Sequence, residues 1–159
     1  MGSRVNDEAV RAAEELYRQG WLEDGSLVNG LFDFANLQGA DLQMADLEAA
    51  HFWSAKLEEA NLTEAYLKET DFWQANLKKA NLSFACLKEA KLSEANLEGA
   101  ELTEADLEGA DLGDANLKGG WLKASDLRNA ILINVDLQNA NLAKANLSGA
   151  LLVGHLEMV

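Results

Sequence analysis

Few residues of this chain have the types and spacing that catalysis requires. The 159 residues include two histidines and a single cysteine, Cys86, which excludes an intrachain disulfide. A nucleophile needs an adjacent base and a metal needs several close ligands, and neither pattern can be assembled here. The nearest approach to acid–base chemistry is His51 near Asp71, or Asp111 beside Asp114, and both fit ordinary surface groups in so acidic a chain. We therefore expect no enzyme, no metal and no cofactor.

The charge of the chain restricts its partners. With 27 Asp and Glu against 13 Lys and Arg, the net charge is −14, whereas nucleic acids and anionic membranes attract basic surfaces. No apolar run reaches the roughly 18 residues of a membrane helix, and no signal-peptide core follows Met1. We expect a cytoplasmic protein that binds neither nucleic acid nor membrane directly. Residues 2–3, Gly-Ser, resemble a cloning remnant, which leaves a removed targeting segment open.

A five-residue repeat must position every surface side chain. Each fifth residue from 22 to 152 is Leu or Phe, 27 times in succession, and 20 of the 24 residues found two places earlier, from 35 to 150, are Ala. A helix would spread these leucines around its axis, and a continuous strand would send them to alternate faces. The chain must therefore turn once per pentapeptide, with Leu and Ala inside. Six glycines two places after the Leu suit turns with positive φ.

The exceptions to the repeat set the size of a coil. Phe replaces Leu at Phe32, Phe52 and Phe72, and outward-facing Trp53 and Trp73 are also twenty residues apart. Large residues that stack on their own kind in successive coils would produce this spacing. We predict four pentapeptides per coil.

The repeat unit, as in residues 35–39 (Ala-Asn-Leu-Gln-Gly), 95–99 and 105–109, is similar to the A(N/D)LXX motif of the pentapeptide repeat protein family. The resemblance covers residues 22–154. It implies an all-β solenoid, a right-handed quadrilateral parallel β-helix, here of about seven coils. We expect Phe32, Phe52, Phe72 and Leu97 in its structural core.

The ends of the chain depart from the repeat and divide it into three segments. Residues 1–20 form a leader with an amphipathic capping helix near 7–19, residues 21–154 form the β-helix, and residues 155–159 form a C-terminal tail. The apolar tail either folds over the last coil or pairs two rods end to end. Some family members dimerise through C-terminal elements, so a monomer and an end-to-end homodimer both remain open.

One side of the predicted rod is a candidate interaction surface. Trp53 and Trp73 should stack there, exposed, on the same face as Asp71, Asp111 and Asp114. Exposed aromatic stacks often mark contact surfaces. The alternative is that the tryptophans only stabilise neighbouring coils.

Two functions are compatible with such a rod. The first is a non-catalytic structural or protein-interaction module that binds an unidentified protein partner. The second follows from the resemblance, because some family members mimic DNA and inhibit or protect DNA gyrase. A mimic needs columns of carboxylates without bases, but here the signs alternate in an expected ladder of ion pairs, which favours the first function. One such column runs Glu48, Lys68, Lys88, Glu108 and Arg128.

Overall fold

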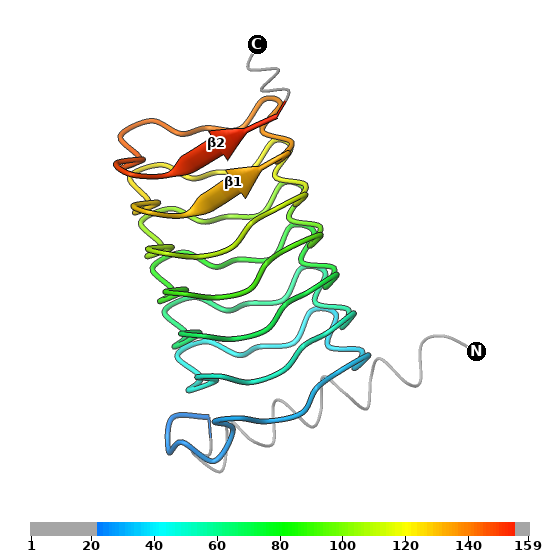
Figure 1. Ribbon diagram of the computed structural model, residues 1–159. Coiled ribbons are helices and arrows are strands. Elements are labelled where there is room, and N and C mark those ends of the chain that lie inside the picture. The colour runs from blue at the N-terminus through cyan, green and yellow to red at the C-terminus, as the bar shows by residue number, and fades with distance from the viewer. Residues whose placement is uncertain (1–21, 155–159) are drawn as a thin grey trace, which may run out of the picture.

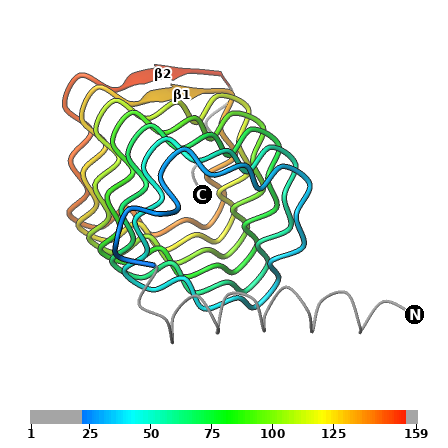
Figure 2. The ribbon, with the colours of Figure 1, turned by 90° about the horizontal axis from the view of Figure 1, so that it is seen from below.

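The computed structural model describes residues 22–154, which form a rod of coils stacked along one axis (Figure 1). Viewed along that axis, successive coils superpose around a common centre (Figure 2). Parallel β-bridges join residues twenty apart, from Leu31 with His51 to Asp126 with Asn146. These bridges confirm the predicted four pentapeptides per coil.

Within residues 22–154, only two segments, both near the C-terminal end, extend into strands of three residues. Strand β1 (Ile131–Ile133) pairs in parallel with β2 (Leu151–Val153), so that Leu132 lies beside Leu152. No helix occurs between residues 22 and 154. The expected helix near 7–19 and the tail at 155–159 lie outside the described residues, so the cap, the tail and the total number of coils remain predictions.

Backbone hydrogen bonds between coils explain why the chain turns at each pentapeptide. The amides of Leu97 and Gly99 donate to the carbonyls of Asn116 and Lys118 in the next coil, at 2.7 and 2.9 Å. The amide of Ala100 donates to the Leu97 carbonyl at 2.9 Å and closes the turn. Most backbone groups of a repeat thus find partners in adjacent coils, as they would in a sheet.

Where Asn or Asp precedes a core residue, its side chain accounts for one further amide. Oδ1 of Asn96 accepts a hydrogen bond from the amide of Glu98 at 3.2 Å, which is the local bond these residues favour in turns. Its side-chain amide also donates to Oδ1 of Asn76 at 3.2 Å, and that of Asn116 donates to Oδ1 of Asn96 at 3.1 Å. The Asn or Asp of the motif therefore has a structural role on the outside of the rod, because its side chain holds the turn and links neighbouring coils.

Positive φ occurs at every turn, and not only where glycine stands. All positions two residues after a core residue, from 29 to 154, have positive φ; six of them are glycine and twenty are other residues, with φ between 53° and 65°. This region normally favours Gly or Asn. The coil-to-coil hydrogen bonds hold even Phe34 and Phe84 in it, at φ 59° and 61°.

The core is the predicted column of Leu and Phe flanked by Ala. Leu97, Phe52 and Phe72 are fully buried, whereas Phe32, in the first described coil, is only partly buried. The rings of Phe32 and Phe52 lie 4.9 Å apart and those of Phe52 and Phe72 lie 5.1 Å apart, both stacked. Thr70 replaces one of the alanines, and its buried hydroxyl donates to the Leu47 carbonyl at 2.9 Å.

Candidate interaction surfaces

Three aromatic side chains on the outside of the phenylalanine column form one surface, which we name the tryptophan patch: Phe34, Trp53 and Trp73. The ring centroids of Phe34 and Trp53 lie 5.5 Å apart, and those of Trp53 and Trp73 lie 5.2 Å apart. Phe34 is 66% exposed and Trp53 is 41% exposed. The two tryptophans lie next to each other in successive coils, as predicted, but their rings are tilted by 43° and Trp73 is only partly exposed; Phe34 extends the contact by one coil.

The acidic residues predicted for this surface do not all lie beside the tryptophans. Oδ1 of Asp71 accepts a hydrogen bond from the Trp73 amide at 3.0 Å, so Asp71 adjoins the patch. Asp111 is two coils further along and is separated from Asp71 by Lys91, whose Nζ lies 3.9 Å from the Asp71 carboxylate. Asp114 comes three residues after Asp111 and accepts a hydrogen bond from the side chain of Asn134 at 3.0 Å.

The other residues with chemical potential form no reaction centre. His51 and Asp71 occupy adjacent coils through a backbone bridge, but no hydrogen bond joins their side chains. Between residues 22 and 154, no group of three or more His, Cys, Asp or Glu is placed to hold a metal ion. The same residues include no helix long and apolar enough to cross a membrane.

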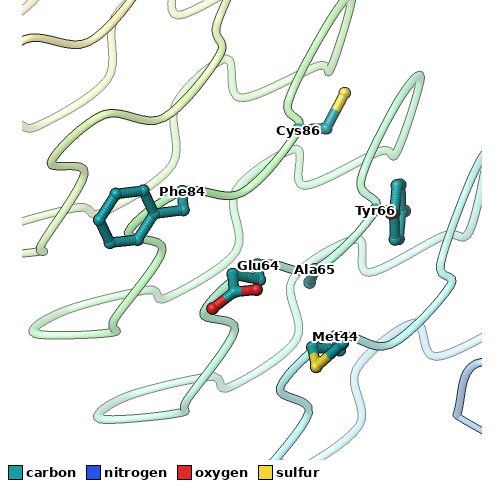
Figure 3. A pocket seen from close by; sticks show the side chains of 6 residues that line it. All are labelled: Met44, Glu64, Ala65, Tyr66, Phe84 and Cys86. Atoms are coloured by element: carbon teal, nitrogen blue, oxygen red, sulfur yellow. The ribbon is translucent and has the colours of Figure 1, made fainter.

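The structure also reveals a surface that our sequence analysis missed. Figure 3 shows an open, shallow pocket at one corner of the rod, which we name the corner pocket. Met44, Tyr66 and Phe84 are 40%, 60% and 54% exposed. A neighbouring hollow shares Met44, Tyr66 and Cys86 and continues toward the acids beside them. The lining residues of the corner pocket are Met44, Glu64, Ala65, Tyr66, Phe84 and Cys86.

One signal in the sequence could have located both surfaces. Among all the turn positions with positive φ that follow a core residue, only Phe34, Met44 and Phe84 carry large apolar side chains. The other turn residues are glycine, alanine or polar. Phe34 belongs to the tryptophan patch, and Met44 and Phe84 belong to the corner pocket.

The charged columns between these surfaces form ion pairs, as predicted. Nζ of Lys88 lies 3.1 Å from the Glu108 carboxylate, and hydrogen bonds to Glu108 and then Asp106 raise the pKa of Lys88. Arg128 bridges Glu108 and Asp126 at 3.1 and 2.8 Å, and its hydrogen bond holds the pKa of Asp126 below the usual value. Bases are thus interleaved with the carboxylates along the rod.

Comparison with known proteins agrees with this geometry. The family model for pentapeptide repeats matches residues 22–53, 55–93, 87–119 and 122–154, with eight copies of the repeat. The chain is a pentapeptide repeat protein. The family forms right-handed β-helices, which agrees with the stacked parallel coils.

Solved structures of similar sequence include two cyanobacterial pentapeptide repeat proteins. Rfr23 from Cyanothece 51142 is 36% identical, over 61% of this chain and 59% of Rfr23, with a TM-score of 0.41. HetL from Nostoc sp. strain PCC 7120, a protein involved in heterocyst differentiation regulation, is 31% identical over 76% of this chain and 73% of HetL, with a TM-score of 0.29. The chain thus spans about three-fifths of the length of Rfr23.

A more distant similarity involves trypsin-treated QnrB1, a plasmid-mediated fluoroquinolone resistance protein. It is 20% identical over 77% of this chain and 79% of QnrB1, with a TM-score of 0.48. The comparison with curated proteins gives no match.

Proposed function

We propose that this pentapeptide repeat protein is a non-catalytic interaction module, a rigid rod that binds a protein partner through the tryptophan patch. The observation that supports this proposal is the continuous contact of three exposed or half-exposed aromatic rings. Phe34, Trp53 and Trp73 present their rings to solvent, although aromatic side chains gain most when they are buried. Clustered exposed aromatics are typical of binding surfaces.

The coil itself does not need these rings. The positions equivalent to Trp53 and Trp73 in the next two coils are Ser93 and Gly113, and the backbone hydrogen bonds there are the same. Phe34 occupies a turn position with φ 59°, and glycine stands at six of the equivalent turn positions. Large aromatic residues at positions that tolerate Ser and Gly support a role beyond stacking the coils.

The residue inventory supports a module without catalysis. Several acids on the outside support turns, as Asp111 does by accepting the amide of Gly113 at 3.0 Å. Between residues 22 and 154, His51 and Cys86 are not joined to acids or bases in a pattern that would activate a nucleophile. The identity of the partner is left to experiment.

Capture of partners by the tagged protein from an extract of the native cell tests the proposal. The double substitution Trp53→Ser/Trp73→Ser should abolish capture, because it removes both aromatic rings from the tryptophan patch. Serine is chosen because the next coil carries it at the equivalent position, Ser93. Hydrogen exchange of the complex should show protection around residues 53 and 73.

A matched control uses another exposed tryptophan on a different side of the rod. Trp121 is 51% exposed and lies between Glu101 and Asn141 in its column. Trp121→Ser should leave capture unchanged. Equal capture by the double variant and the wild type, or equal loss in both variants, would contradict a role for the tryptophan patch.

A further inference from the structure

The corner pocket lies across the rod from the tryptophan patch. Phe34 and Met44 both follow core residues, and Met44 comes ten residues, or half a coil, after Phe34. Half a coil places the two turns at opposite corners. A partner bound at one surface would therefore leave the other free.

Three apolar side chains in the corner pocket are exposed without serving the core. Met44 and Phe84 belong to the same column of turns, two coils apart, and Tyr66 stands in the adjacent column, bridged to Cys86 (Figure 3). At about 4.8 Å per coil, Met44 and Phe84 are separated by about 10 Å along the rod. Apart from Phe34, the equivalent turn positions elsewhere carry glycine, alanine or polar residues.

An acid with no partner lies between the two apolar turns. Glu64 occupies the turn of the intervening coil and is exposed, with φ 59°. Its carboxylate forms no ion pair or hydrogen bond with any residue between 22 and 154, whereas Glu48, Glu98 and Glu108 are all paired. The Tyr66 hydroxyl likewise forms no hydrogen bond within that range.

The surroundings of the pocket are acidic. Glu23, Asp46 and Glu48 line the adjoining hollow together with one base, Lys68. Nζ of Lys68 is already held by the carboxylates of Glu48 at 3.4 Å and Glu69 at 2.8 Å. The electrostatic field at the pocket therefore attracts cations.

We propose that the corner pocket binds a segment of a partner protein in which a basic side chain is flanked by apolar ones. The basic group pairs with Glu64, and the flanking side chains contact Met44 and Phe84. Arginine fits better than lysine, because a guanidinium can pair with a carboxylate and also lie over an aromatic ring such as Tyr66. The proposal is independent of the tryptophan patch.

Methionine methyl NMR gives a direct test. With ¹³C-methyl methionine, the full chain has three labelled methyls, of which Met44 reports on the pocket while Met1 and Met158 report on the termini. The probe is a capped synthetic peptide of alternating leucine and arginine, and its glutamate analogue is the negative peptide. We expect a saturable shift of the Met44 signal with the arginine peptide and none with the glutamate peptide.

Matched variants separate this site from general attraction to an acidic protein. Glu64→Gln should weaken binding about tenfold or more, because it removes a charge-assisted hydrogen bond. Glu89→Gln is the control, since Glu89 is exposed at an equivalent turn (φ 56°) of another corner. Phe84→Ser should also weaken binding, whereas Trp53→Ser/Trp73→Ser should not.

Three results would overturn the proposal. The first is no shift of Met44 with the arginine peptide. The second is equal weakening by Glu64→Gln and Glu89→Gln, which would indicate attraction by net charge alone. The third is a concentration-dependent shift of Met44 without peptide, which would show that a second copy of the chain occupies the pocket. Unchanged thermal melting of each variant confirms that the fold is intact.

Discussion

Most core leucines in the middle of the rod are packed between leucines one coil before and one coil after them. Leu97 is fully buried between the coils of Leu77 and Leu117, and Ala95, 1% exposed, lies beside it. Large and small side chains share the interior, and each coil contributes the same few atoms to it. A change in volume at one position is therefore felt by the neighbouring coils.

Replacement of Leu97 by Ala should lower the free energy of unfolding by about 2–5 kcal/mol, because it leaves a cavity in a column without spare side chains. Urea or thermal unfolding measures the loss. Lys118→Ala, on the exposed surface, is the control and should change stability by no more than about 0.5 kcal/mol. Similar losses in both variants would contradict the inward assignment of the repeat.

Sequence alone was sufficient for the core and the coil size, but not for the outer turns. Phe32, Phe52 and Phe72 set the twenty-residue period because core side chains stack on their own kind. Positive φ was expected only at glycines, whereas Phe84 and Met44 adopt it too, since hydrogen bonds between coils impose the turn on any residue. The corner pocket was missed because its residues come from three coils and two columns.

At the scale of the elements, β1 and β2 share a central leucine but differ in how far that leucine is buried. The central leucine of β1, Leu132, is 1% exposed, whereas Leu152 of β2 is 38% exposed. Both leucines occupy the same place in the repeat and are paired in register. Substitutions at Leu132 and Leu152 can therefore be compared to measure how much a covering coil contributes to stability.

Leu132→Ala should destabilise the rod by about 2–5 kcal/mol and Leu152→Ala by clearly less, because a half-exposed side chain has less area to lose from burial. Thermal unfolding of the two variants under one condition checks the difference. Equal losses would contradict a stabilising contribution of the coil that covers Leu132.

The ion-paired column should make part of the stability depend on pH. Arg128 holds the pKa of Asp126 below its unfolded value, so the stabilisation is present above the unfolded pKa, near 4, and is lost as the pH falls through the lowered folded value. In a plot of melting temperature against pH, the fall at low pH is the acid limb. Asp126→Asn should make this acid limb less steep between about pH 2 and 5. Asparagine keeps the acceptor that holds the turn amide of Arg128, so the turn is retained while the titrating carboxylate and its ion pair with Arg128 are removed.

Asp136→Asn is the matched control. Asp136 supports the same kind of turn by accepting the amide of Gln138 at 2.9 Å, and none of the ion pairs described above includes it. Its substitution should leave the acid limb close to that of the wild type. A steep limb that persists in Asp126→Asn would show that other carboxylates carry the pH dependence.

For the whole molecule, shape and charge favour different functions. A stacked rod with a net charge of −14 resembles a stretch of nucleic acid in outline, but its charge is distributed differently. In one column Lys68, Lys88 and Arg128 outnumber the two carboxylates, Glu48 and Glu108, and pair with them. Duplex DNA carries an uninterrupted negative charge every ~1.7 Å along its axis.

We therefore expect the purified protein to leave DNA supercoiling by gyrase unchanged, even in excess over the enzyme and at low salt, where electrostatic attraction is strongest. A dose-dependent effect that salt weakens, and that Asp111→Asn/Asp114→Asn also weakens, would favour the DNA mimic instead. The triple variant Lys68→Glu/Lys88→Glu/Arg128→Glu makes one column wholly acidic without touching the core. If this variant affects gyrase and the wild type does not, then the interleaved bases, and not the rod shape, keep this chain from acting as DNA.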